Sequence, residues 1–413
     1  MTISVANNGM RYAVRSYGNA TAYCALSVKV GTRNEGKYHN GIAHFMEHTL
    51  FKGTVRHSSD YINNCLEQLG GELNAYTTRE EIVLHATVLR DDIAKAASLL
   101  AEIAFEASFP EDEIEIEKGV VIDEIASYKD SPADDIFDVF EEKLFAGGPL
   151  SRPILGTPES VQAITSDELR RFRKEFFTPD RMAFTMVSPL PEKKMTAIVE
   201  RVVSRYGASD GKVDAHCDSS ASFAPQCGTA VFDVTEDKED HQVNCIIGGP
   251  GPAMPDERKR LATILLCNML GGPASNSILG RILRERHGWV YNVECSFTPY
   301  SDCGVVLIAF GCDKENLGKC TRVVRRELRR LQDNLLSDSR LRAAKRQLLG
   351  QNAIALESGE AQCLSMGKSL ICFGNILQDE DVASRIQSIT SEEVRQMARE
   401  VFRDSAVSRL VYL

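Results

Sequence analysis

The residues best suited to do chemistry lie in one short stretch, GIAHFMEHTLFKGT, which runs from Gly41 to Thr54. In a helix, residues three and four positions apart lie on the same face. His44 and His48 would therefore aim two imidazoles at one point, with Glu47 beside it. A catalytic zinc ion takes three protein ligands and keeps a fourth position open for water. The stretch therefore predicts a short buried helix that presents three polar groups together. Its two histidines would make an incomplete zinc site, or they would be satisfied structurally by carbonyls, and the spacing alone leaves both interpretations open.

The ends of this helix and its opposite face also follow from the sequence. We expect Asn40 to be the N-cap and Gly53 to stop the helix at its C-terminus. The remaining positions turn to the other side and are expected to pack into a core: Ile42, Phe45, Met46 and Thr49.

A third ligand is sought in residues 110–128, PEDEIEIEKGVVIDEIASY, which have a helical pattern. Glu117 and Glu124 are seven residues apart, so two helical turns bring them to the same side. Acids among Val and Ile are costly unless they are paired or bound to a cation. The spacing alone leaves two interpretations open, a metal ligand on this helix or a solvated acidic face.

Composition and charge exclude several classes of protein. The chain has 413 residues, of which 43% are hydrophobic and 26% charged, as in ordinary soluble proteins. Its net charge of −10 argues against nucleic acid as a partner. No apolar run reaches the roughly 18 residues that would span a bilayer. The N-terminus, MTISVANNGMRYAV, has no signal-peptide pattern, so we expect a cytoplasmic protein.

The twelve cysteines are scattered along the chain without a C-x-x-C pair. Disulfide frameworks belong to short secreted chains. We therefore expect reduced, mostly buried cysteines.

An internal repeat predicts a duplicated domain. Two similar segments begin 225 residues apart: ITSDELRRFRKEFFTPDRMAFTMV from Ile164 and ITSEEVRQMAREVFRDSAVSRLVYL from Ile389. Each has the pattern of a capped helix followed by a strand. The segments that start at Gly70 and His287 also correspond, since both run from glycine into a strand pair and then a long helix. The period is too long for a solenoid of short repeats.

The predicted fold is α+β, with two homologous domains that each pack helices on a mostly antiparallel sheet. We expect an N-terminal domain at residues 1–206 and a C-terminal domain at residues 229–413. Residues 207–228 are rich in Ser, Ala, Asp and Gly, which indicates a linker. Long amphipathic helices are predicted at residues 92–105 and 314–331.

These motifs resemble the pitrilysin or insulinase family of zinc peptidases, which includes the mitochondrial processing peptidases. The order His-x-x-Glu-His is the inverzincin signature. In that family a glutamate some 76 residues past the second histidine, in an E-x6-E helix, is the third ligand, and Glu124 has this position. The segments GGELNAYTTRE and LGGPASNSILGRILRERHGWVYNV resemble further family motifs, so the similarity covers nearly the whole chain.

The resemblance implies one zinc ion per chain and a role for each matching residue. His44, His48 and Glu124 would be the metal ligands, and Glu47 would be the general base. Glu117 would support the ligands from behind. In the family's pattern, Asn74, Arg284 and Tyr291 would contact the substrate.

The resemblance also implies that a chain of this length forms half of a clamshell. We expect a homodimer that cleaves short or unfolded polypeptides, with a heterodimer with a related subunit as the alternative. A non-catalytic scaffold subunit of a heterodimeric peptidase is the rival function, and a metal-binding protein without peptidase activity is the third. The scaffold is disfavoured because all three ligands and the base are present.

Overall fold

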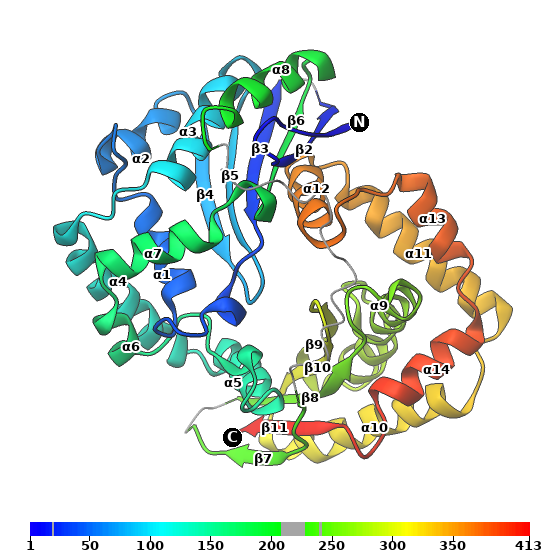
Figure 1. The fold of residues 1–413 in the computed structure, drawn as a ribbon. Coiled ribbons are helices and arrows are strands. Elements are labelled where there is room, and N and C mark those ends of the chain that lie inside the picture. The colour runs from blue at the N-terminus through cyan, green and yellow to red at the C-terminus, as the bar shows by residue number, and fades with distance from the viewer. Residues whose placement is uncertain (19, 208–227, 239–241) are drawn as a thin grey trace. The chain divides into compact units, whose positions relative to one another are not determined.

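The computed structural model describes residues 1–18, 20–207, 228–238 and 242–413. These residues form two compact units, each built on one sheet (Figure 1). Of the described residues, unit 1 contains 1–18, 20–125, 152–207 and 354–376, and unit 2 contains 126–151, 228–238, 242–353 and 377–413. The expected fold class, two similar α+β domains with mostly antiparallel sheets, is confirmed.

The sheet of unit 1 has six strands in the order β1-β2-β6-β3-β5-β4. All neighbours pair antiparallel except β2 and β6. The strands are β1 (Thr2–Val5), β2 (Arg11–Ser16), β3 (Thr21–Val28), β4 (Glu72–Thr77), β5 (Ile82–Leu89) and β6 (Met182–Ser188). The helices are α1 (Ile42–Leu50), α2 (Ser59–Glu67), α3 (Ile93–Glu106), α4 (Glu111–Lys129, mostly in this unit), α6 (Pro158–Ala163), α7 (Ser166–Phe176), α8 (Glu192–Val203) and α12 (Gly359–Phe373). Short 3-10 turns are η1 (Thr32–Asn34), η2 (Arg90–Asp92) and η4 (Pro179–Arg181).

The sheet of unit 2 repeats this order with five strands, β7-β11-β8-β10-β9. Only β7 and β11 pair parallel. The strands are β7 (Asp233–Glu236), β8 (Val243–Gly251), β9 (Val290–Pro299), β10 (Gly304–Cys312) and β11 (Ser408–Tyr412). The helices are α5 (Pro132–Leu144), α9 (Glu257–Gly271), the π-helix η5 (Gly280–Arg286), α10 (Leu317–Asp333), α11 (Asp338–Ala355, mostly in this unit), α13 (Asp379–Gln387) and α14 (Ser391–Val401). Two 3-10 turns are η3 (Pro149–Ser151) and η6 (Lys314–Asn316).

The predicted repeat is visible in the order of elements. The segment from Ile164 forms α7 and β6, and the segment from Ile389 forms α14 and β11. The two predicted long helices are α3 and α10, and each follows a paired hairpin, β4-β5 or β9-β10.

Each sheet is apolar on both faces. Side chains alternate between the faces along a strand, so β6 and β10, which are buried at every position, contribute to both faces. In unit 1, one face packs against α3 and α8, and the other packs against α12. Thr185 fixes α12 to the sheet by donating a hydrogen bond to the carbonyl of Cys363 (2.9 Å). In unit 2, α5 covers one face with Ile136 and Phe140, and helices α9, α10 and α14 lie on the other.

The compact units therefore differ from the predicted continuous ranges 1–206 and 229–413. Helix α12 comes from the second half of the chain but belongs to unit 1, and α5 comes from the first half but belongs to unit 2. A sheet with two apolar faces needs cover on both, and the helices of its own half cover one face only. The predicted linker, 207–228, lies outside the described residues except for its two end positions. No helix in the described part of the chain is long and apolar enough to cross a membrane.

Candidate metal centre

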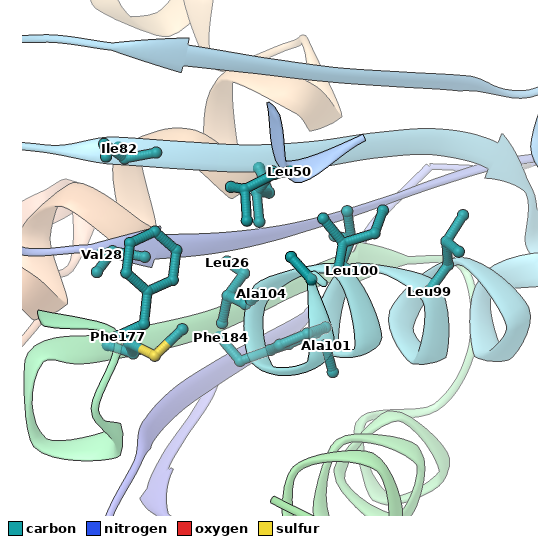
Figure 2. Close-up of a cluster of buried hydrophobic side chains, with 14 of the residues drawn as sticks. Leu26, Val28, Leu50, Ile82, Leu99, Leu100, Ala101, Ala104, Phe177 and Phe184 are labelled. Carbon is teal, nitrogen blue, oxygen red and sulfur yellow. The ribbon is translucent and has the colours of Figure 1, made fainter. Parts of the chain in front are cut away.

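The predicted helix exists as α1, and its two faces have the predicted characters. Ile42, Phe45, Met46 and Thr49 are fully buried. Figure 2 shows how the last residue of the helix, Leu50, lies in the core of unit 1 among side chains of β3, β5, β6 and α3. This packing fixes the C-terminal end of α1, because truncation of a buried leucine costs about 2–5 kcal/mol.

The predicted caps of α1 are partly wrong. The N-cap is Gly41 instead of Asn40, and its backbone is left-handed (φ 85°). The helix ends at Leu50, three residues before Gly53. Glycine offers no side chain to accept from the first amides of the helix, so these amides need a partner from elsewhere.

The two histidines of α1 and Glu124 of α4 converge. Nε2 of His48 lies 3.3 Å from Oε2 of Glu124, and Nε2 of His44 lies 3.8 Å from the same oxygen. The ligand atoms of the three residues all lie within 4.8 Å of one another, and they form the one such group among the described residues. His44 is buried, whereas the carboxylate of Glu124 is 43% exposed. The cluster is therefore open to solvent on the side of α4.

Glu117 lies behind His48 and holds its ring. Nδ1 of His48 donates to Oε1 of Glu117 (2.8 Å), and Lys52 forms a salt bridge with the other carboxylate oxygen. With a proton on Nδ1, the unprotonated Nε2 faces Glu124. A carboxylate that orients a histidine in this way is the usual support of a metal-ligating imidazole.

Glu47 lies beside the cluster on α1 and is held by β4. Its Oε2 accepts a hydrogen bond from the hydroxyl of Thr77 (3.0 Å). Burial raises the pKa of Glu47, whereas His48 and the Thr77 hydroxyl lower it. Burial is the larger effect, so the pKa of Glu47 is raised overall, while His48 and Thr77 favour the ionised form that a base requires.

The two histidines differ in their electrostatics. Burial, together with the neighbouring His48, lowers the pKa of His44 to about 3. Burial alone would also lower the pKa of His48, but the surrounding carboxylates, with Glu117 foremost, outweigh it and raise that pKa. Burial would raise the pKa of Glu117, but the hydrogen bonds from His48 and Lys52 lower it.

The donor set fits a zinc ion. Two imidazole nitrogens and one carboxylate oxygen are ligands that Zn²⁺ accepts, and a set of three leaves a coordination position open. Three carboxylates stand close to His48, so a cation at their centre would also balance the negative charge.

The other predicted site residues lie elsewhere. Asn74 is exposed on β4, the edge strand of unit 1, opposite His85 of β5. Arg284 lies in η5 and pairs with its neighbour Glu285. Tyr291 lies on β9, is 67% exposed and donates to Asp313 (3.3 Å). Arg284 and Tyr291 belong to unit 2, and their role in substrate binding stays a prediction.

Sequence reasoning missed two residues of this cluster. Thr77 lies within the segment that the resemblance marked, but no spacing connects it to Glu47. Lys52 follows α1 directly, and a cation two residues after the helix has no distinctive pattern. The other described histidines of unit 1 have carboxylate partners: His39 pairs with Glu168, His57 with Glu102 and His85 with Glu360. Eight of the ten cysteines in the described part of the chain are buried, in line with the prediction.

Comparison with known proteins identifies the family. Residues 11–158 match the model of the insulinase family (peptidase family M16), and residues 163–348 match the model named peptidase M16 inactive domain. An uncharacterized zinc protease of Streptomyces coelicolor is 30% identical over 90% of this chain and 80% of the relative. The chain belongs to the insulinase family of peptidases. An uncharacterized zinc protease of Bacillus subtilis is 28% identical over 98% of this chain and 96% of its own.

Solved structures show the same fold. A protease from Helicobacter pylori superimposes with a TM-score of 0.88 over 100% of this chain and 98% of its own, at 19% identity. A structure titled as a peptidase M16 inactive domain, from Pseudomonas fluorescens, gives a TM-score of 0.87 at 18% identity. The insulinase family model, matched by residues 11–158, covers the residues of the metal centre. The inactive-domain model, matched by residues 163–348, covers Arg284 and Tyr291.

Proposed function

We propose that this insulinase-family protein is a zinc-dependent endopeptidase. The observation that carries the proposal is the convergence of His44, His48 and Glu124 beside the buried carboxylate of Glu47. That its relatives are named zinc proteases supports the same activity.

The three converging side chains would hold one zinc ion per chain. When bound, zinc supplies a Lewis acid that polarises a carbonyl and makes a water molecule more acidic. His44 would bind as a neutral imidazole, since burial keeps it unprotonated. Glu117 would fix the ring of His48 so that Nε2 stays directed at the metal position.

Glu47 would be the general base. Its carboxylate would take a proton from the attacking water and later deliver that proton to the amine nitrogen of the leaving peptide. The Thr77 hydroxyl, donating to Oε2, would favour the ionised form that the first step requires.

The substrate would be an extended stretch of a short or unfolded polypeptide. Strand β4 is at the edge of its sheet and lies against α1, so its outer backbone groups could pair with a peptide strand. Pairing through the backbone accepts varied sequences. Asn74 would contact the peptide at this edge, and Arg284 and Tyr291 would contribute substrate contacts from unit 2.

We also propose that the protein works in the cytoplasm as a homodimer, with a heterodimer with a related subunit as the alternative. A non-catalytic scaffold subunit remains the rival function. The second half matches a domain described as inactive, which favours a division of labour between the halves. The complete set of ligands and base in unit 1 disfavours a scaffold as the role of the whole chain.

The test is a paired assay of the wild-type protein and Glu47→Gln. Elemental analysis measures zinc per chain, and mass spectrometry follows cleavage of an unstructured peptide library. We expect about one zinc in both proteins and a loss of cleavage by about 10²- to 10⁴-fold in the variant. Zinc binding without cleavage in the wild-type protein, at concentrations where dimers form, would favour the scaffold.

A further inference from the structure

We infer that Glu35 and Arg152 form a positioning pair that holds the N-terminal end of α1 and thereby the metal-binding side chains one turn later. This inference rests on the proposed function. Neither residue reaches the metal cluster itself, and no feature of the sequence had pointed to them.

Glu35 supplies the cap that Gly41 lacks. Its Oε1 accepts hydrogen bonds from the backbone amides of Gly41 (3.0 Å) and Ala43 (3.1 Å). Ala43 directly precedes the first histidine of the cluster. A carboxyl group at this end of a helix also faces the positive end of the helix dipole.

Glu35 is fully buried, so its carboxyl group is held within the core of unit 1 and is not a mobile surface group. Its other oxygen forms a salt bridge with Arg152, whose Nη1 lies 3.7 Å from Oε2. Arg152 also donates to the carbonyls of Gly36 (2.8 Å) and Tyr38 (3.5 Å). One guanidinium group therefore contacts both Glu35 and the loop that leads into α1, and it holds them in fixed positions relative to each other.

The backbone after Arg152 presses against the same end of the helix. A Cβ atom on Gly41 would lie 2.8 Å from Cα of Gly156, and a Cβ atom on Gly156 would lie 2.6 Å from the carbonyl oxygen of Asn40. Both glycines have positive φ, 85° and 76°. Only residues without a side chain allow this approach, so the segment 152–156 braces α1 as well as Glu35.

The chain connectivity places both ends of one excursion into unit 2 close in sequence to residues of the proposed site. The chain leaves unit 1 after Ile125, one residue past Glu124, and returns to it at Arg152. The excursion into unit 2, which includes α5, therefore begins next to the third proposed ligand and ends at the residue that positions the other two. A small displacement of reacting groups can cost about 100-fold in rate, so this pair would set the geometry of the site.

The test compares Glu35→Ala, Glu35→Gln and Arg152→Ala with the wild-type protein. Zinc affinity is measured by competition with a chromophoric chelator, and kcat and KM are measured on an unstructured peptide at saturating zinc. Hydrogen exchange of the amides of residues 41–48 reports the rigidity of α1 without zinc or substrate. Asp135→Ala is the matched control, because Asp135 is a buried acid of unit 2 that accepts from Tyr412.

We expect Glu35→Ala to weaken zinc binding and lower kcat by about 10-fold or more, the range seen when groups that orient metal ligands are removed. KM should change by less than about two-fold, since the substrate-binding edge is untouched. Glu35→Gln should recover most of the loss, because its carbonyl oxygen can accept from both amides. Arg152→Ala should lie between them, and Asp135→Ala should leave zinc affinity unchanged.

The inference is overturned if Glu35→Ala keeps wild-type exchange rates, zinc affinity and kcat. If Glu35→Ala does not fold, Arg152→Ala becomes the deciding variant, since it leaves both hydrogen bonds from the backbone amides to Glu35 in place. Wild-type behaviour of Arg152→Ala would then overturn the inference. Zinc binding without peptide cleavage in the wild-type protein would contradict the proposed peptidase function but not the role of Glu35 and Arg152. The affinity and exchange measurements would still decide on the pair.

Discussion

The helix that follows the central strand differs between the two units, although the strands around it follow the same order. In unit 1 the central strand β3 leads to α1 and then to the edge hairpin β4-β5. In unit 2 the central strand β8 leads to α9 and then to β9-β10. Helix α1 carries His44, Glu47 and His48, whereas α9, with the sequence ERKRLATILLCNMLG, carries leucines and a cysteine in its middle.

The difference shows what the duplicated fold provides and what it does not. The sheet order and the helix positions are common to both units, so they are a frame that is stable with or without a polar site. Buried polar groups need partners, and unit 1 supplies them through Glu117, Lys52 and Thr77. The proposed chemistry therefore depends on a few polar contacts that unit 1 adds to the shared arrangement of strands and helices.

Removing a proposed metal ligand should have the largest effect, because unit 1 would then lack a complete metal site, as the described part of unit 2 does. His48→Ala deletes one of the three proposed ligands, so zinc per chain should fall from about one to near zero and cleavage should fall by at least about 100-fold. Elemental analysis after dialysis and the peptide assay measure both. His57→Ala is the control, because His57 also pairs with a buried carboxylate, Glu102, outside the cluster. Full zinc content in His48→Ala would contradict the assigned ligands.

A smaller loss is expected when the support of the ligand is weakened. Glu117→Gln keeps the shape of the side chain but removes the charge that fixes the ring of His48, so zinc affinity should fall by about 10- to 100-fold. Chelator competition measures it. Glu115→Gln on the same helix is the control, since Glu115 pairs with Lys118 instead. Equal affinities of the two variants would show that Glu117 only satisfies local charge.

A shift in pH dependence is expected when Thr77 is replaced. The hydroxyl of Thr77 favours the ionised form of Glu47, so Thr77→Val should raise the pKa of Glu47. The acidic limb of kcat/KM should then move to higher pH, by up to about one unit, with little change on the plateau. Thr87→Val on the neighbouring strand should leave the profile in place. A shift to lower pH would contradict the role of Glu47 as base.

The smallest effect is expected in unit 2. His287 is the one histidine among the described residues of that unit. His287→Ala should change zinc content by less than about two-fold, because His287 is not part of the His44, His48 and Glu124 cluster. The same elemental analysis measures it. A clear loss of zinc would mean that the second unit takes part in metal binding.

The sequence was sufficient for the parts of the site that depend on local periodicity. The spacing of His44 and His48 fixes their common face, and the spacing of Glu117 and Glu124 does the same on α4. The spacing alone left a ligand and a solvated face open for Glu124, and the resemblance to a family favoured the ligand.

The parts that the sequence could not provide depend on contacts between distant segments. Glu35 reaches the amides of α1, and Arg152 lies more than 100 residues further along the chain. The sequence also could not show that α5 packs in unit 2 and α12 in unit 1, because the pattern of an amphipathic helix does not show which sheet it will cover. The N-cap was misassigned because Asn40 is a typical capping residue, whereas the actual cap is a carboxyl group from outside the helix.

X-ray absorption at the zinc edge of the zinc-loaded protein tests the central claim most directly. Nitrogen and oxygen ligands lie about 2.0–2.2 Å from zinc, and sulfur ligands lie at about 2.3 Å. A site built from α1 and α4 predicts a shell of nitrogen and oxygen with the scattering of two imidazoles. Sulfur in the shell would contradict it, because it would place the metal among the cysteines instead of at His44, His48 and Glu124.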